Sequence, residues 1–467
     1  MGRNNITAIP FAFFKLALGY LALGILLGLA GSFQYLLPDF LKEKLGFQHI
    51  RPLHVYLVIA WIFTAAHGAI YYFVQKLTGR NLKYPGAAKF HFGLQVLISL
   101  LVLYHFFAGN FSGREYLEFP VWIGGLIALS WVPFAANVFG TLKPDYKNGP
   151  VYHYSWTVGI VFFLITLGEA YLWQFAWFHN NIIRDVTIQW KAMGSMVGAW
   201  NMLVYGSAMA SMAMMLKDEN FAKSKTVFLF FFVGFVNLMF NWGHHTYTVP
   251  AAPFVRNVAF IISMTELVLF ANIIFKWWRG MKHNMQLKHK SSSMVLMFAD
   301  NWILINLALS IAISVPALNY YTHGTHITVA HAMGATIGIN TLLLFAVIYQ
   351  IADEENRALK RRGKMMVAGT WITNISLLVF FTGLIVAGII KILNNQEKVP
   401  FAEMMIRSKP TFVVLASSGA LLMVGLLMMC IAAFSKMRKR RYEEEELSGT
   451  YIKEREETEE LAFSEIH

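Results

Sequence analysis

The segment THITVAHAMGATIGINTLLLFAVIYQ, residues 325–350, is apolar enough and long enough to cross a lipid bilayer as one helix. It nevertheless carries a histidine at position 331 and a methionine at position 333. On a helix that turns by about 100° per residue, His331 and Met333 point to nearly opposite faces. They therefore cannot bind one metal ion together, although each is a ligand that haem iron accepts.

The whole chain has the composition of an all-α polytopic membrane protein. Of its 467 residues, 57% are hydrophobic and only 14% are charged, which is unlike an ordinary soluble domain. The single cysteine, Cys430, excludes a disulfide framework and a cysteine-ligated cluster. Any metal must therefore be bound by histidine, methionine or carboxylate side chains.

The apolar runs predict twelve membrane-spanning helices, because each run is close to the length that crosses the hydrocarbon core. They are separated by short polar connections, and no long hydrophilic insert interrupts them. The predicted spans are residues 11–37, 53–75, 87–109, 119–141, 152–178, 188–215, 225–243, 251–276, 293–316, 325–350, 366–393 and 410–434.

The charges between the spans predict the orientation. The even-numbered connections, such as residues 76–89 and 357–364, are rich in Lys and Arg, whereas odd-numbered ones such as 109–118 are not. Both termini are therefore expected in the cytoplasm. The net charge of +13 is explained by these loops, so we expect no nucleic-acid partner. Residues 1–434 form one membrane domain, and the charged tail 435–467 is expected to be a solvated or disordered appendage.

Several histidines lie at membrane depth, where polar side chains are costly and usually have a partner or a function. These are His54, His67, His91, His105, His244, His245 and His331. Taken singly, each is more often a hydrogen-bonded structural residue than a ligand. The adjacent pair in FNWGHHTYTVPAAP, residues 240–253, is different because the helix ends there, so both imidazoles can face one ion. Imidazole is a ligand that suits copper, iron and zinc.

Four motifs in a fixed order resemble one protein family. They are RPLHVYLVIAWIFTAAHGAIYY (51–72), NWGHHTYTVP (241–250), SMTEL (263–267) and NYYTHGTHITVAHAMGATIG (319–338). On twelve spans, this pattern resembles the catalytic subunit I of the haem–copper oxidase superfamily, and among its branches the large subunit of nitric oxide reductase. The resemblance covers nearly the whole chain. It implies a twelve-helix bundle in the bacterial cytoplasmic membrane.

The resemblance implies two b-type haems. His54 matches one axial ligand of the low-spin haem, and His331 matches the ligand of the high-spin haem. Met333 stands where the family has the second low-spin ligand, usually a histidine. A thioether there would raise the reduction potential of that haem. Arg51 and His323 match places where the family has polar groups around the haem propionates.

The resemblance also implies a second metal, non-haem iron or copper, facing the high-spin haem. His244 and His245 match two of its three histidine ligands. The third belongs in the sixth span, where aligning the segment QWKAMGSMVGAWNMLVYG (189–206) on its glycine and tryptophan puts Met193 at the histidine position. A shift of one residue puts Gly194 there and leaves no third ligand, and both alignments stay open.

The same alignment places Val197 and Asn201 where nitric oxide reductases have two glutamates. Without the carboxylate, two imidazoles and a thioether form a softer site that favours copper(I). Glu266 matches a family glutamate that helps to deliver protons. The alternative for Glu266 is a structural carboxylate paired with a cation such as Arg256, Lys191 or Lys15.

The activity implied by the resemblance is the reduction of two nitric oxide molecules to nitrous oxide and water with two electrons and two protons. The electrons would come from a membrane-anchored cytochrome c subunit or another donor. Because the expected ligands are partly replaced, three alternatives stay open: nitric oxide dismutation, oxygen reduction as a cytochrome oxidase, and a haem protein without turnover. A remote alternative is a twelve-span transporter, which would bind no haem.

Overall fold

The computed structural model describes residues 6–250, 252–283, 291–355 and 363–464, and for residues 265–271, 280–283 and 438–464 it describes the backbone only. Within these ranges the fold is all-helical, apart from one isolated bridge between Arg114 and Leu117. The predicted all-α class is therefore confirmed.

The long helices occur in the order of the predicted spans. They are α1 (Ala8–Gln34), α2 (Phe47–Thr78), α3 (Pro85–Phe107), α4 (Val121–Leu142), α5 (Val151–Glu169), α7 (Ile182–Leu216), α8 (Lys225–Phe240), α9 (Pro253–His283), α10 (Ser291–Ser314), α14 (Lys364–Gln396) and α15 (Phe401–Ser464). The tenth predicted span is one continuous stretch made of α12 (His326–Met333), the π-helical segment η5 (Gly334–Thr341) and α13 (Leu342–Glu355). Short helical turns connect them: η1 (Leu172–Gln174), α6 (Ala176–His179), η2 (Glu219–Lys223), η3 (Asn241–Thr246) and α11 (Pro316–Thr322).

In the part of the chain that the structure describes, ten helical stretches are long and apolar enough to cross a membrane. The other two predicted spans fall on α7 and on α9, and the side chains of α9 are described only in part. The number twelve therefore stays a prediction, although every predicted span coincides with a helix.

Local sequence signals explain where several helices begin and end. The side chain of Asn181 accepts hydrogen bonds from the backbone N–H groups of Ile183 and Arg184 and so caps the start of α7. Thr325 caps α12 in the same way. After α2, Gly79 adopts a φ of 64°, a conformation that ends helices and that glycine tolerates best.

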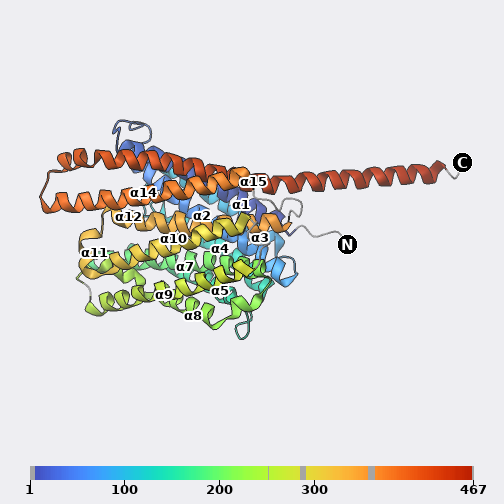
Figure 1. Ribbon diagram of the computed structural model, residues 1–467, viewed down its shortest axis with the longest axis horizontal. Coiled ribbons are helices and arrows are strands. Elements are labelled where there is room, and N and C mark those ends of the chain that lie inside the picture. The colour runs from blue at the N-terminus through green and yellow to red at the C-terminus, as the bar shows by residue number, and fades with distance from the viewer. Residues whose placement is uncertain (1–5, 251, 284–290, 356–362, 465–467) are drawn as a thin grey trace.

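Two helical stretches occupy the centre of the bundle. Among these ten stretches, the most apolar window of α2 is 89% buried and that of His326–Glu355 is 72% buried, whereas none of the other eight exceeds 44%. Figure 1 shows α2, α7, α10 and α12 enclosed between the α14–α15 pair on one side and α8 and α9 on the other. The sequence-predicted ligands His54, His331 and Met333 thus lie on the two most buried of these ten stretches.

Ion pairs mark the two ends of the bundle. At one end Arg51 pairs with Glu115 (2.5 Å) and Glu118 (3.0 Å). At the opposite end of α2, Lys76 pairs with Glu355 at 3.1 Å. The backbone of α15 is helical as far as Ser464, and its last part projects away from the bundle (Figure 1).

Candidate functional site

His54 is held against α1 by a close contact with two glycines. Its Nδ1 lies 2.7 Å from the carbonyl oxygen of Gly24, so the N–H is on Nδ1 and the lone pair is on Nε2. A Cβ atom on Gly28 would lie 2.7 Å from the imidazole, so only glycine leaves room for the ring there. A hydrogen bond from the ring nitrogen that does not bind the metal is how proteins orient a histidine ligand. The contact of His54 with Gly24 fits its expected role toward haem iron.

His244 and His245 face one another at the end of α8. They lie in the 3₁₀ turn η3, and their Nε2 atoms are 3.0 Å apart. The Nδ1 atom of His244 is 2.9 Å from the side-chain oxygen of Asn241, which also accepts a hydrogen bond of 2.5 Å from Ser263 of α9. Because Asn241 fixes the N–H on Nδ1, the Nε2 lone pair of His244 points toward His245. Two imidazole nitrogens at this separation can bind one metal ion.

Aromatic rings surround this histidine pair. Trp190 of α7 lies flat against His245, with ring centroids 4.7 Å apart and planes within 6° of parallel. His323, which follows α11, lies edge-on to His245 at 6.1 Å. Burial lowers the pKa of His323 and favours its neutral form. His331 is close enough to His244 and His245 to interact with both electrostatically, so the structure brings together the predicted ligands of the high-spin haem and of the second metal.

Helix α7 approaches the histidine pair at the predicted third ligand. Met193 is buried, one turn after Trp190. At the next residue, a Cβ on Gly194 would lie 2.7 Å from the Cβ of Trp242 in η3, so the two segments touch there. No group of three or more His, Cys, Asp or Glu side chains suited to a metal exists among the residues that the structure describes. The donors that face one another there are two imidazoles, and Met193 lies on the adjacent helix.

Met333 ends α12, where the helix changes to the π-helical segment η5. Insertions of π-helix are rare and frequently occur at functional sites. The described contacts of Met333 are with the hydrophobic core, and none of them joins it to His54. Its role as a haem ligand therefore stays a prediction.

Several charged residues have partners that the sequence did not indicate. Lys191 is paired with Glu169, and Arg51 with two glutamates, so neither is a free cation. Lys15 lies over the ring of Phe434. Glu266 is on the backbone of α9, but its side chain lies outside the part of the chain described at that level.

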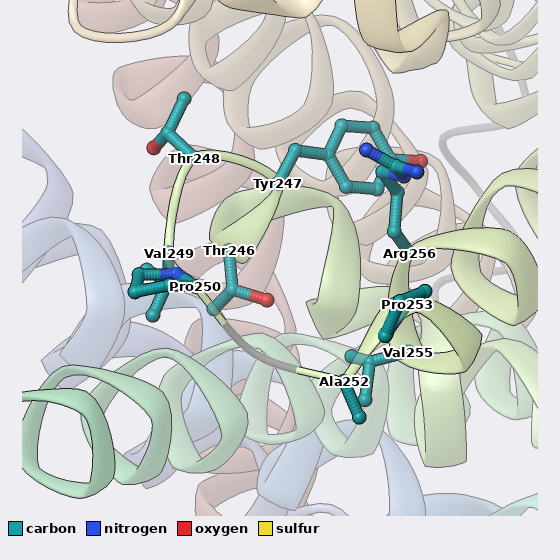
Figure 2. Close-up of a pocket in the computed structure, with 9 residues that line it drawn as sticks. All are labelled: Thr246, Tyr247, Thr248, Val249, Pro250, Ala252, Pro253, Val255 and Arg256. Carbon is teal, nitrogen blue, oxygen red and sulfur yellow. The ribbon is translucent and has the colours of Figure 1, made fainter.

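A surface pocket of about 290 Å³ lies directly after the histidine pair, in the connection to α9. Figure 2 shows the guanidinium of Arg256 beside the phenol of Tyr247 on the rim of this pocket. Burial raises the pKa of Tyr247 to about 12, while Arg256 acts in the opposite direction. Since none of the predicted ligands lines the pocket, it is not the candidate reaction site.

Sequence reasoning missed the residues that hold the ligands in place. Asn241 carries a recognisable signal, since it precedes His244 by three residues and so shares one face of a 3₁₀ turn with it. Gly24 and Gly28 are four residues apart, so the sequence predicts that they lie on the same face of a helix, but it does not predict that His54 packs against that face. Trp190 has no local signal at all, because its stacking on His245 depends on how α7 packs against η3.

Comparisons with known proteins agree with this arrangement. Residues 8–434 match the family described as "Cytochrome C and Quinol oxidase polypeptide I". A nitric oxide reductase subunit of Stutzerimonas stutzeri is 24% identical over 418 residues, which cover 84% of this chain and 85% of the relative. The Cbb3-type cytochrome c oxidase subunit CcoN1 of the same organism is 22% identical over 448 residues, covering 90% of this chain and 92% of that protein.

A solved structure shares the fold. The cryo-EM structure of a heme-copper terminal oxidase dimer superposes with a TM-score of 0.75 at 13% identity, covering 93% of this chain and 84% of the other. The members of the matched family are oxidoreductases that bind haems and a second metal. From its fold, its paired histidines and its match along almost the whole membrane domain, this chain belongs to the haem–copper oxidase subunit I family.

Proposed function

We propose that this protein is a respiratory catalytic subunit that reduces two nitric oxide molecules to nitrous oxide and water, using two electrons and two protons. The observation that carries the proposal is the convergence of His244 and His245, whose Nε2 atoms lie 3.0 Å apart. The hydrogen bond from Nδ1 of His244 to Asn241 leaves the Nε2 lone pair of His244 available to a metal ion. The likeness to a nitric oxide reductase supports this choice of substrate.

The residues fit the groups that the family binds. His54 and Met333 would hold the low-spin haem, His331 the high-spin haem, and His244 and His245 the second metal. When bound, these groups supply electron transfer and a place for the substrate. The protein contributes orientation, because hydrogen bonds fix the N–H of His54 and His244 on Nδ1 and leave Nε2 for the metal.

Other side chains protect and serve the site. Trp190 covers one face of His245, which restrains the ring and excludes water from that side. Met193 would complete the ligand set from α7. Glu266 on α9 is proposed to pass protons toward the site, as its position in the SMTEL motif suggests. These roles can be tested one residue at a time.

We further propose that the second metal is copper. The described side chains place no carboxylate in a three-ligand cluster with the histidine pair, and the family glutamate position holds Val197. Imidazole and thioether ligands favour copper(I), whereas iron sites of this type use an oxygen ligand. The copper site and the likeness to a cbb3-type oxidase subunit also favour a second candidate function, oxygen reduction.

The proposed setting is the bacterial cytoplasmic membrane, with both termini in the cytoplasm. The basic connections at the end of the bundle that carries Lys76 support this orientation. Electrons would come from a partner protein, a membrane-anchored cytochrome c subunit or another donor, and the substrate is a small gas.

The test is gas consumption by the purified protein with a reduced artificial donor, followed with nitric oxide and oxygen electrodes. We expect nitric oxide to be consumed with one electron per molecule. His244→Ala should abolish consumption, whereas His105→Ala, at a histidine of α3 that packs against Trp122, should not. Oxygen consumption without nitric oxide consumption would establish the second candidate instead. A protein that holds both haems and consumes neither gas would refute the proposal.

A further inference from the structure

Two histidines outside the candidate metal site are buried, and three of their four ring nitrogens lack hydrogen-bond partners among the described residues. His67 of α2 and His91 of α3 are 1% and 0% exposed, with ring centroids 4.9 Å apart. Neither ring nitrogen of His67, nor Nε2 of His91, has a hydrogen-bond partner among the residues that the structure describes. The remaining nitrogen, Nδ1 of His91, is 3.0 Å from the hydroxyl of Tyr71.

The surroundings of this pair are aromatic. Phe134 and Trp131 of α4 lie 4.3 Å and 4.9 Å from the His67 ring, centroid to centroid. Each unpaired buried polar group costs about 1–3 kcal/mol. Three such nitrogens in one place therefore need a partner from outside the protein, and water is the smallest molecule that can both donate and accept hydrogen bonds to them.

A cavity next to His67 has room for that water. Its volume for water-sized probes is about 70 Å³, and one water needs about 10–15 Å³ by that measure. Helices α2, α3, α4, α5 and α7 form its walls together with part of the 108–120 connection. The polar side chains on its lining are Tyr56, His67, Gln95 and Tyr116.

The cavity extends along α2 and reaches α7 beside the candidate site. Tyr56 lines it near one end of α2, and His67 lines it eleven residues later, a rise of about 16 Å. Tyr56 is itself hydrogen-bonded to Ser99 at 2.9 Å. From α7 the lining residue is Met196, one turn after Met193. The cavity therefore connects the buried histidines with the helix that faces the proposed metal.

We propose that this cavity holds a chain of water molecules, and that His67, with His91 and Tyr71 behind it, carries protons through it to the reaction site. Imidazole is suited to this role because it can accept a proton on one nitrogen and release one from the other. Chains of ionisable side chains within spans commonly serve as proton relays. One ring nitrogen of His67 accepts a proton from cavity water on the Tyr56 side while the other releases a proton to cavity water on the α7 side, so no net charge accumulates on the ring.

Few titratable groups lie near His67, so we take His67 as the residue of the cavity that accepts the proton. Its titratable neighbours are His91 and, behind it, Tyr71, while Tyr56 and Tyr116 lie farther along the cavity. Helices α1, α4, α5 and α7 present aromatic or apolar side chains to it. This inference rests on one part of the proposed function, namely that the protein binds haems that accept electrons.

The experiment injects one electron into the purified holoprotein from a photoexcited ruthenium complex and follows haem reduction and a pH indicator in the same sample. No gaseous substrate is needed. We expect His67→Phe and His67→Gln to slow proton uptake at least tenfold, while the haem spectra and carbon monoxide binding stay unchanged. Ala60→Leu, which adds volume to the cavity wall without touching the histidine, should also slow it. His105→Phe, the same change outside the cavity lining, should not.

The outcomes separate the two proposals. Missing haem signals in the wild-type protein would be a failure of the proposed function. Normal haem reduction with wild-type proton uptake in both His67 variants would overturn the relay. Wild-type uptake in Ala60→Leu would overturn the water chain, and equal slowing in His105→Phe would overturn the assignment to this cavity. His67→Gln decides the matter if His67→Phe fails to fold.

Discussion

Replacing Gly28 with alanine should remove the low-spin haem while leaving the fold intact. The added methyl carbon would start 2.7 Å from the imidazole of His54, whereas such atoms normally approach to about 3.5 Å. The ring must therefore move by roughly 0.8 Å, which would lengthen its 2.7 Å hydrogen bond to Gly24 beyond the normal range. Loss of such an outer partner weakens metal binding about 10- to 100-fold, or about 1.4–2.8 kcal/mol.

The assay is the reduced-minus-oxidised spectrum of the purified variant, with haem counted per protein. Gly19→Ala is the matched control, because it lies on the same helix and a Cβ there meets nothing within 4 Å. We expect Gly19→Ala to match the wild type and Gly28→Ala to lose the low-spin signal. A Gly28→Ala protein with a full low-spin haem and an unchanged spectrum would refute the reasoning about His54.

Three further changes test other parts of the structure. Asn241→Leu removes the partner of His244 and should reduce occupancy of the second metal about 10- to 100-fold, measured by metal analysis. Burial raises the pKa of the Glu118 carboxyl in spite of its arginine partner. The contribution of Glu118 to stability is therefore present at low pH and is lost as the pH rises through the raised pKa. Glu118→Gln should flatten that part of the plot of melting temperature against pH. Lys436→Met breaks the ion pair with the buried Asp353 and should lower the midpoint of thermal unfolding, because breaking a buried ion pair is destabilising.

The fold was largely accessible from the sequence because a bilayer imposes a simple rule on chain length and polarity. Every predicted span coincides with a helix, and the family resemblance is confirmed. The rule is less informative for α7, which is not among the ten described stretches that are apolar enough to cross a membrane. It also does not foresee the π-helical segment after Met333, since one extra residue per turn leaves the apolar pattern almost unchanged.

The site was only partly accessible. The pair His244 and His245 could be recognised because adjacent histidines at a helix end are uncommon, and the structure brings His331 close to them. The stacking of Trp190 and the glycine contacts of His54 could not be foreseen, because each joins residues that are far apart in the chain. For His67 and His91 the sequence shows two polar residues in spans but not that one cavity lies beside them.

The most direct test is to purify the protein from membranes, record its carbon monoxide difference spectrum, and count haem, iron and copper in the same sample. The account predicts two haems per chain, one of which binds carbon monoxide, and one copper. A single haem, or no haem that binds carbon monoxide and no additional metal, would contradict it and would show that His244 and His245 do not form a metal centre.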